Sequence, residues 1–501
     1  MSYDEGHRRT RQTRTAGDYV DYGYDAIGQL KTATGKEYGG TTNRVNELFG
    51  YAYDGAGNIN YRTNNALVQT FNVNSLNELT TGTRSGNKTV AGGTTIDATS
   101  VKVNANGGGD VYAIRYADRS FARTNVTLVN GNNTFVATAQ DSLNRYATNT
   151  VALSLPATNS FIYDLNGNLR TNGTTVLTYD DENELTQVVV SNVTKSDFTY
   201  DGKMRRRVRK ESVWANGAWR TNLEVRYVYD GNLVIQERHY DSQLGTTLPQ
   251  RTVAYTRGLD LSGSMQGAGG IGGLLARTEL TTSNPERLTH AFYHSDANGN
   301  VTAMVDTNQQ VVARYLYDPF GGLLTSSGPL AEANFYRFSG KEFHVASRLV
   351  YYLYRCYDPQ LQRWLNRDPI EEAGAPNLYQ FVRNNAADLV DSFGQQITMP
   401  DPFPHKPFEV PPAGTGGTSG GNLPPAFPVI IYPKCNKEGE VRSRKGWYMG
   451  DPCPCTNTAR RCFDFERCEL VGTAGTQGTT SRLGWVPHQN CQPCPEGNYP
   501  P

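Results

Sequence analysis

One short phrase returns along most of this chain and constrains its fold more than any other feature. The phrase is an aromatic residue, an aspartate, two or three turn-forming residues, Gly-Asn or a close relative, and then an aliphatic residue. Plain copies begin at Tyr24, Tyr53, Tyr163, Tyr179, Tyr229 and Tyr317, and worn copies begin at Phe71 and Tyr200. Such repetition indicates an architecture that is built by stacking similar units.

Each copy of the phrase has the chemistry of a β-hairpin. The aromatic residue ends one strand, the aspartate bonds the backbone of the turn, glycine takes a left-handed conformation, and the aliphatic residue opens the return strand. A single hairpin is unstable in water, whereas stacked hairpins bury a shared aromatic face. The sequence therefore predicts an all-β fold in which the hairpins form one long, spiralling antiparallel sheet.

The phrase disappears between about Ser85 and Pro156, where short alternating strands are joined by Asn-Gly turns. We interpret this segment as an inserted β-sandwich that resembles bacterial Ig-like domains and serves in spacing or display. The predicted domains are repeat hairpins at 1–84, the insert at 85–156, repeat hairpins at 157–290, a distinct end-piece at 291–394, a linker at 395–429 and a cysteine-rich module at 430–501.

Composition excludes some classes of protein and leaves others open. Lys+Arg and Asp+Glu both number 48, so no global field attracts nucleic acid or an acidic membrane. The mean hydropathy is -0.56 and no apolar run is long enough to predict a membrane span. The N-terminal stretch MSYDEGHRRTRQTRT has no apolar segment typical of a secretory signal, and it looks like half a repeat. We therefore expect a fragment, or a module that a partner completes.

The stretch from Tyr293 to Gly394 combines several motifs in a fixed order. It contains YHSDANGNVTAMVD, RYLYDPFGGLL and YRFSGKEFHVASRLVYYLYRCYDPQLQRWLNRDPIEEAGAPNLYQFVRNNAADLVDSFG. These motifs resemble the RHS repeat-associated core domain. The repeated phrase resembles the YD repeat of RHS proteins, teneurins and the C components of insecticidal toxin complexes. The resemblance implies that the sheet winds into a hollow shell, and that a variable effector follows it, as in polymorphic toxins.

Two aspartates near the end of this domain form the sharpest chemical hypothesis. RHS proteins that process themselves use an Arg-Asp-Pro motif and a later Asp-Pro-x-Gly-Leu motif as an intramolecular aspartyl protease. The first motif is Arg367-Asp368-Pro369, whereas the second reads Asp391-Ser392-Phe393-Gly394-Gln395 and lacks the Pro and the Leu.

Two close carboxyls do not both ionise easily, so one can act as an acid while the other activates water. The resemblance implies catalytic roles for Asp368 and Asp391, with Arg367 holding one carboxylate charged, and cleavage between Gln395 and Gln396. The alternative is that both aspartates only start turns.

For two further motifs we prefer a structural interpretation to a binding function. The run Gly267–Gly273 satisfies a dinucleotide-binding pattern, but no strand-turn-helix unit surrounds it, so we expect a tight backbone crossing in the sheet. The basic run Lys203–Glu211 could contact phosphates, but a strand would divide its charge between two faces. Nucleic-acid binding by the repeats is therefore not expected.

Beyond Gly394 the chain becomes a Pro- and Gly-rich linker and then a cysteine-rich module. The module holds the disulfide candidates Cys435, Cys453, Cys455, Cys462, Cys468, Cys491 and Cys494. Disulfides suit an exported protein. A zinc site at Cys453, Cys455, Cys491 and Cys494 is the alternative, although the spacing is unusual. His488 with Asp464 and Glu466 makes no recognisable catalytic set.

The first functional hypothesis is a secreted or cell-surface RHS shell, or part of one, whose partners are its own C-terminal module as cargo and a target cell. The runner-up is a non-catalytic adhesion protein whose exposed repeat tyrosines stack on carbohydrate. A degenerate fragment without activity is the third reading. No cofactor is expected under any of them, and the only enzymatic activity considered is self-cleavage.

Overall fold

The structure, a computed structural model, describes residues 1–245, 247–281, 284–395, 397–398, 441–452, 460–470 and 483–487. Side chains are described for 1–245, 247–281 and 288–395. The chain divides into two compact units, Met1–Lys406 and Pro407–Pro501. Each unit is considered by itself.

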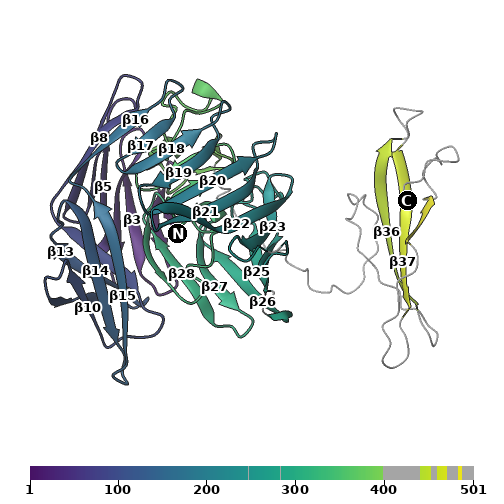
Figure 1. The fold of residues 1–501 in the computed structure, drawn as a ribbon, viewed down its shortest axis with the longest axis horizontal. Helices are drawn as coiled ribbons and strands as arrows, with labels where there is room; N and C mark the ends of the chain where they lie inside the picture. Colours follow the sequence, from purple (N-terminus) through teal and green to yellow (C-terminus); the bar gives the residue numbers. More distant parts are fainter. Residues whose placement is uncertain are drawn as a thin grey trace. The chain divides into compact units, whose positions relative to one another are not determined.

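The first unit is built around one antiparallel sheet of 22 strands, which confirms the predicted all-β fold (Figure 1). Strands that follow each other in sequence pair with each other, except where β8 pairs with β16. The strands are β1 (Ser2–Tyr3), β2 (Arg9–Thr13), β3 (Tyr19–Tyr24), β4 (Leu30–Lys36), β5 (Asn43–Tyr53), β6 (Ile59–Asn64), β7 (Leu67–Val73), β8 (Leu79–Ser85), β16 (Thr158–Tyr163), β17 (Leu169–Asn172), β18 (Thr175–Tyr179), β19 (Leu185–Val190), β20 (Thr194–Tyr200), β21 (Arg206–Ala215), β22 (Ala218–Asp230), β23 (Leu233–Asp241), β24 (Arg251–Arg257), β25 (Leu274–Thr281), β26 (Asn284–Ser295), β27 (Val301–Asp306), β28 (Val311–Tyr317) and β29 (Leu323–Ser327).

The repeated phrase forms the hairpin turns of this sheet, as the sequence predicts. In the second copy, the Asp54 carboxylate accepts hydrogen bonds from the backbone N–H groups of Ala56 and Asn58, both at 2.9 Å. Gly57 has a φ of 76°, and the register shifts at Tyr53. The copy at Tyr229 differs, because Asp230 stays in the ladder opposite Leu233 and the turn is shorter.

The repeat tyrosines fasten neighbouring hairpins together. Five of them donate a hydroxyl hydrogen bond to a backbone carbonyl 15 to 23 residues earlier in the chain. They are Tyr24, Tyr53, Tyr200, Tyr229 and Tyr317, and all five rings are half-buried. The hydroxyl groups of these five tyrosines are therefore engaged within the sheet, and the adhesion hypothesis stays a prediction.

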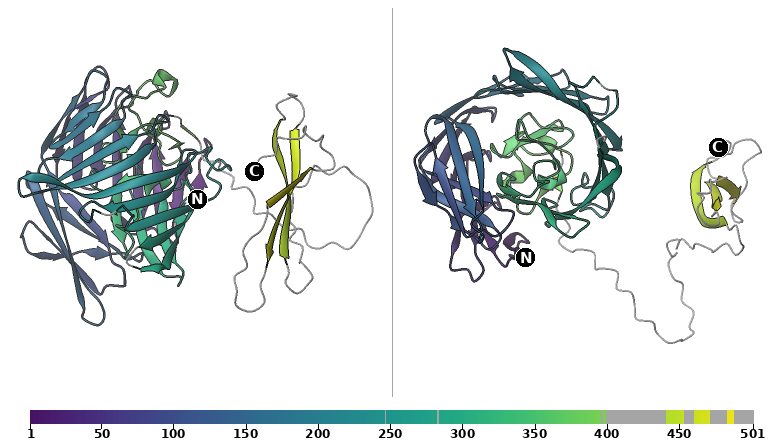
Figure 2. Two further views of the ribbon diagram at one scale, coloured as in Figure 1. Left: turned by 45° about the vertical axis from the view of Figure 1, so that its right-hand side comes forward. Right: turned by 60° about the horizontal axis from the view of Figure 1, so that its bottom comes forward.

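The C-terminal part of the first unit lies inside the curve of the sheet (Figure 2, right). Its aromatic side chains Tyr352, Tyr357, Trp364 and Phe381 pack against the buried inner face of the sheet in one hydrophobic cluster. The elements of this core segment are η1 (Phe338–Gly340), β30 (Glu342–His344), β31 (Leu349–Tyr351), β32 (Cys356–Asp358), β33 (Arg363–Trp364), η2 (Glu371–Ala373), η3 (Val382–Asn384), β34 (Val390–Asp391) and β35 (Ile397–Thr398). The sheet therefore encloses a segment of its own chain.

Between β8 and β16 the chain leaves the large sheet and forms two small sheets. Their strands are β9 (Lys88–Gly93), β10 (Ser100–Ala105), β11 (Asp110–Tyr112), β12 (Ile114–Arg115), β13 (Ser120–Val126), β14 (Gly131–Gln140) and β15 (Tyr146–Leu155). Val101, Val103 and Phe121 form a small core, and Arg44 of β5 contacts Asp118 at 2.7 Å. The assignment of this segment as an Ig-like domain, and its bounds, stay predictions.

The second unit contains a three-stranded antiparallel sheet of β36 (Val441–Pro452), β37 (Arg460–Leu470) and β38 (Leu483–Pro487). None of the helices in the described parts of the chain is both long and apolar enough to cross a membrane.

Candidate self-cleavage site

The two predicted aspartates come together in the core segment around one arginine. Asp368 lies in the turn after β33, Asp391 ends β34, and Arg355 lies just before β32. The Arg355 Nη2 atom is 2.7 Å from Asp368 Oδ2 and 3.8 Å from Asp391 Oδ2. All three residues are buried. Since one guanidinium nitrogen approaches both carboxyl groups, the two carboxyls are neighbours.

Asp391 also shapes the loop that contains the predicted cleavage bond. Its Oδ1 atom accepts backbone hydrogen bonds from Phe393 at 3.1 Å, Gly394 at 2.6 Å and Gln395 at 3.1 Å. Gly394 has a φ of 87°, which favours glycine at this position. Asp391 pairs with Ile397, so the bond between Gln395 and Gln396 lies in the connection between β34 and β35. The retained Asp and Gly of the motif therefore both shape this connection.

The carbonyl of Gln395 lies on the same side of Gly374 as the Asp368 carboxyl. A Cβ atom added to Gly374 would be 2.7 Å from Asp368 Oδ2 and 3.5 Å from the Gln395 oxygen. Arg355 adds a hydrogen bond from Nε to the Gly394 carbonyl. The loop and the two carboxyls are thus held by the same guanidinium.

Burial raises the pKa of both carboxyls above the usual range for aspartate. Arg355 opposes this rise at both carboxyls, while the nearby Asp391 carboxylate adds to the rise in the pKa of Asp368. Burial also lowers the pKa of Arg355 to about 10, against the two carboxylates, which raise it. A pair in this setting can hold one proton between two carboxyls, which is the state that aspartyl hydrolysis requires.

The structure corrects the predicted role of Arg367. Its guanidinium contacts Glu78 at 3.3 Å rather than either aspartate. Arg355, which sequence reasoning missed, occupies the place between the carboxyls. No repeat or motif spacing marks Arg355, because its partners follow 13 and 36 residues later and only the folded loop brings them together.

The Gly267–Gly273 run forms part of the loop between β24 and β25, and it uses a carboxylate of its own chain. Asp260 Oδ2 accepts hydrogen bonds from the backbone N–H groups of Ala268 at 2.8 Å and Gly270 at 3.0 Å. A phosphate would need such N–H groups free. The nucleotide-binding reading therefore stays rejected.

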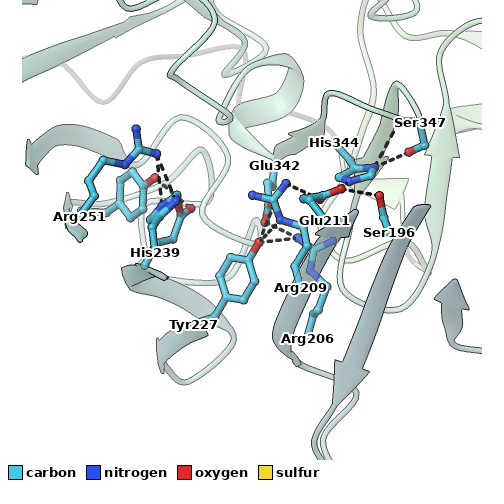
Figure 3. A network of polar contacts seen from close by, with 12 residues as sticks. Ser196, Arg206, Arg209, Glu211, Tyr227, His239, Arg251, Glu342, His344 and Ser347 are labelled. Carbon is cyan, nitrogen blue, oxygen red and sulfur yellow. Dashed lines mark hydrogen bonds and ion pairs between the residues drawn. The ribbon is translucent and has the colours of Figure 1, made fainter. Parts of the chain in front are cut away.

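The basic run Lys203–Glu211 divides its charge between two faces of β21. Arg206 and Arg209 are buried, whereas Arg207 and Lys210 are exposed. The buried pair belongs to a polar network that reaches the core segment (Figure 3). Arg206 forms an ion pair with Glu342 of β30, and Arg209 donates to the Tyr227 hydroxyl at 3.0 Å. These arginines fasten the core segment to the sheet.

Several predicted site residues lie outside what the structure describes. Gln396, Cys435, Cys453, Cys455, His488, Cys491 and Cys494 are outside the described residues. Cys462, Asp464, Glu466 and Cys468 lie in β37, whose backbone alone is described. The disulfide and zinc readings therefore stay predictions.

Comparisons with known proteins find relatives that match parts of this chain. No protein-family model matches the chain. The chain is 29% identical over 249 residues to a tRNA3(Ser)-specific nuclease WapA of Bacillus spizizenii, which covers 48% of this chain and 9% of the relative. It is 34% identical over 106 residues to the toxin subunit YenC1 of Yersinia entomophaga, across 21% of this chain and 11% of the relative.

The chain is similar over part of its length to proteins of the RHS/YD-repeat family, as its motifs indicate. It spans only about a tenth of the length of these two relatives. A crystal structure of TcdB2-TccC3-Cdc42 is similar to this chain at 18% identity, with a TM-score of 0.40, over 79% of this chain and 19% of that one.

Proposed function

We propose that this chain is an RHS β-shell, or part of one, that carries its C-terminal module as cargo and releases it by cleaving itself after Gln395. The observation that supports the proposal most is the pair of buried carboxyls at Asp368 and Asp391, which shares Arg355 beside the loop that holds Gln395.

In the proposed reaction, water is the nucleophile. The ionised carboxyl of the pair takes a proton from water, and the oxygen adds to the Gln395 carbonyl carbon. The protonated carboxyl donates to the carbonyl oxygen, and the carbon–nitrogen bond to Gln396 breaks as a proton passes to the leaving nitrogen. Water is consumed, and a carboxylic acid and an amine are formed. Arg355 limits the build-up of negative charge on the pair.

The proposed cargo is the cysteine-rich module at 430–501, which a linker at 395–429 separates from the shell. Its position after the core domain, and relatives that are named tRNA nucleases and toxin subunits, support a toxic role for such a module. We propose that the shell acts outside the cell, as a secreted or cell-surface protein, and that cysteines of the module pair as disulfides. Since the module has seven cysteines, one is left as a free thiol or forms an intermolecular bridge. Zinc at Cys453, Cys455, Cys491 and Cys494 remains the alternative.

The proposal is tested by the intact mass of freshly purified chain. We expect the wild type to give a fragment that begins at Gln396, and Asp368→Asn and Asp391→Asn to stay whole. Asp388→Asn is the matched control, because Asp388 is also buried in the core segment but accepts from Arg9 and Tyr24 instead. A whole wild-type chain, or a cleaved Asp368→Asn variant, would overturn self-cleavage and leave the aspartates as turn residues.

A further inference from the structure

A buried lysine connects the cleavage loop to the glycine-rich loop. Lys341 lies just before β30 and is 8% exposed. Its Nζ atom donates to the Ser392 carbonyl at 2.6 Å and to the Gly269 carbonyl at 2.7 Å. These two carbonyls lie more than a hundred residues apart in sequence. One side chain therefore connects the loop after β34, which leads to the proposed cleavage bond, with the loop between β24 and β25 of the large sheet.

The contact between the two loops depends on glycine. A Cβ atom at Gly269 would be 1.8 Å from the Ser392 oxygen, a distance that no side chain allows. Gly269 also has a φ of 63°, which favours glycine for a second reason. The run that resembled a nucleotide-binding motif thus provides a surface on which the cleavage loop lies.

Lys341 is buried among aromatic rings although it has no direct ion pair with a described residue, which is unusual for a lysine. Its Nζ lies 5.4 Å from the Tyr352 ring and 5.5 Å from the Phe393 ring. Among the described residues no carboxylate lies within salt-bridge distance of it. Burial lowers its pKa to about 7, against Asp391 and Asp260, which raise it, while Arg257 adds to the lowering. Burying an amine without a directly paired carboxylate costs free energy, so a role in holding the two loops would explain why this lysine is kept here.

We propose that Lys341 and Gly269 form a clamp that positions the Gln395 carbonyl against Asp368. Lys341 acts through the loop backbone, so it is a positioning residue and not a catalytic one. The effect of the clamp on reaction rate rests on the proposed self-cleavage. The clamp itself is a property of the loop and can be measured without cleavage.

The kinetic test compares rates of appearance of the fragment in the full chain. Lys341→Met keeps a side chain of similar length and removes both hydrogen bonds. We expect it to slow cleavage tenfold or more, since about 1 Å of misplacement can cost about a hundredfold. Lys341→Gln retains two N–H donors and should recover part of the rate. Cleavage of Lys341→Met at the wild-type rate would overturn the inference.

A glycine pair provides the matched control. Gly269→Ala and Gly272→Ala both place alanine at positive φ, 63° and 78°. Only the first directs its Cβ at Ser392, whereas the second meets Leu261 at 3.1 Å. We expect Gly269→Ala to slow cleavage strongly and Gly272→Ala to slow it little. Equal slowing would mean that general strain, and not the clamp, explains the effect.

A readout that needs no cleavage separates the two proposals. In an Asp368→Asn background, which keeps the chain whole, Lys341→Met should speed hydrogen exchange at the amides of Phe393, Gly394 and Gln395. Unchanged exchange would overturn the clamp. If the wild type is never cut but exchange rises, self-cleavage fails and the clamp stands as a structural feature of this loop.

Discussion

The repeat sheet and the core segment that it encloses solve the same problem of stability in different ways. In the sheet, a typical repeat turn is completed by its own residues, as when Asp54 bonds the N–H groups of Ala56 and Asn58. In the core segment, short strands are held by partners far away in sequence, such as Arg206 for Glu342. The contrast shows that local turn chemistry is enough to form the repeat hairpins, whereas bringing the two buried carboxyls together takes long-range contacts.

The two regions should also differ in how well they tolerate change. A hairpin of the sheet is stabilised by the neighbours on both of its sides, so the loss of one contact should have a small effect on the stability of the sheet. The core segment has few ladder hydrogen bonds, and it relies on close packing of Tyr352, Tyr357, Trp364 and Phe381. Substitutions of similar chemistry should therefore lower stability more in the core segment than in the repeat sheet.

The largest expected effect is that of Trp364→Ala. Trp364 is 1% exposed and contacts three aromatic rings, so its removal leaves a cavity and should lower the free energy of unfolding by about 3–5 kcal/mol. The control is Trp214→Ala at a hairpin of the sheet, where the side chain is 38% exposed and contacts Trp219. That loss should be about 0.5–1.5 kcal/mol. Denaturant titrations of both variants measure the difference, and equal losses would contradict it.

Sequence reasoning reached the sheet and the two aspartates because both have local signatures. The turn chemistry repeats at Tyr53 and its relatives, and the motifs at Asp368 and Asp391 are contiguous. It missed Arg355 and Lys341, because their partners are set by how loops fold back on each other. It also expected a hollow shell from resemblance, whereas the aromatic residues of the core segment pack against the inner face of the sheet.

Aspartates in the two regions respond to pH with opposite sign. Burial raises the pKa of Asp358 in β32 to about 6, against its own backbone hydrogen bonds. Its contribution to stability is therefore present below about pH 4 and is lost as the pH rises through 6. At Asp201 in a sheet turn, burial raises the pKa, but hydrogen bonds from Arg205 and Lys203 outweigh it and bring it to about 2. That contribution is present above about pH 4 and is lost as the pH falls through 2.

Substitution by asparagine should expose this difference. At pH 7, Asp358→Asn should raise the free energy of unfolding by up to about 3 kcal/mol, since Asn keeps the acceptor for Gln360 and Leu361 and removes the charge. Asp201→Asn should lower it by about 1 kcal/mol, because its pairs with Arg205 and Arg207 are partly exposed. Urea titrations at pH 4.5 and 7 check both signs. A shift of the same sign in both variants would remove the contrast.

The smallest expected effect tests whether the repeat tyrosines fasten hairpins. Tyr53→Phe removes the hydrogen bond from the hydroxyl to the Leu30 carbonyl, 2.9 Å long, and keeps the ring. We expect a loss of about 1 kcal/mol in the free energy of unfolding. Tyr61→Phe is the control, because that side chain is 39% exposed and its change should be near zero. Because the sheet spreads the loss of a local contact, hydrogen exchange should rise at β4 and β5 alone. A rise that extends into the core segment would mean that the sheet and the core segment unfold as one unit.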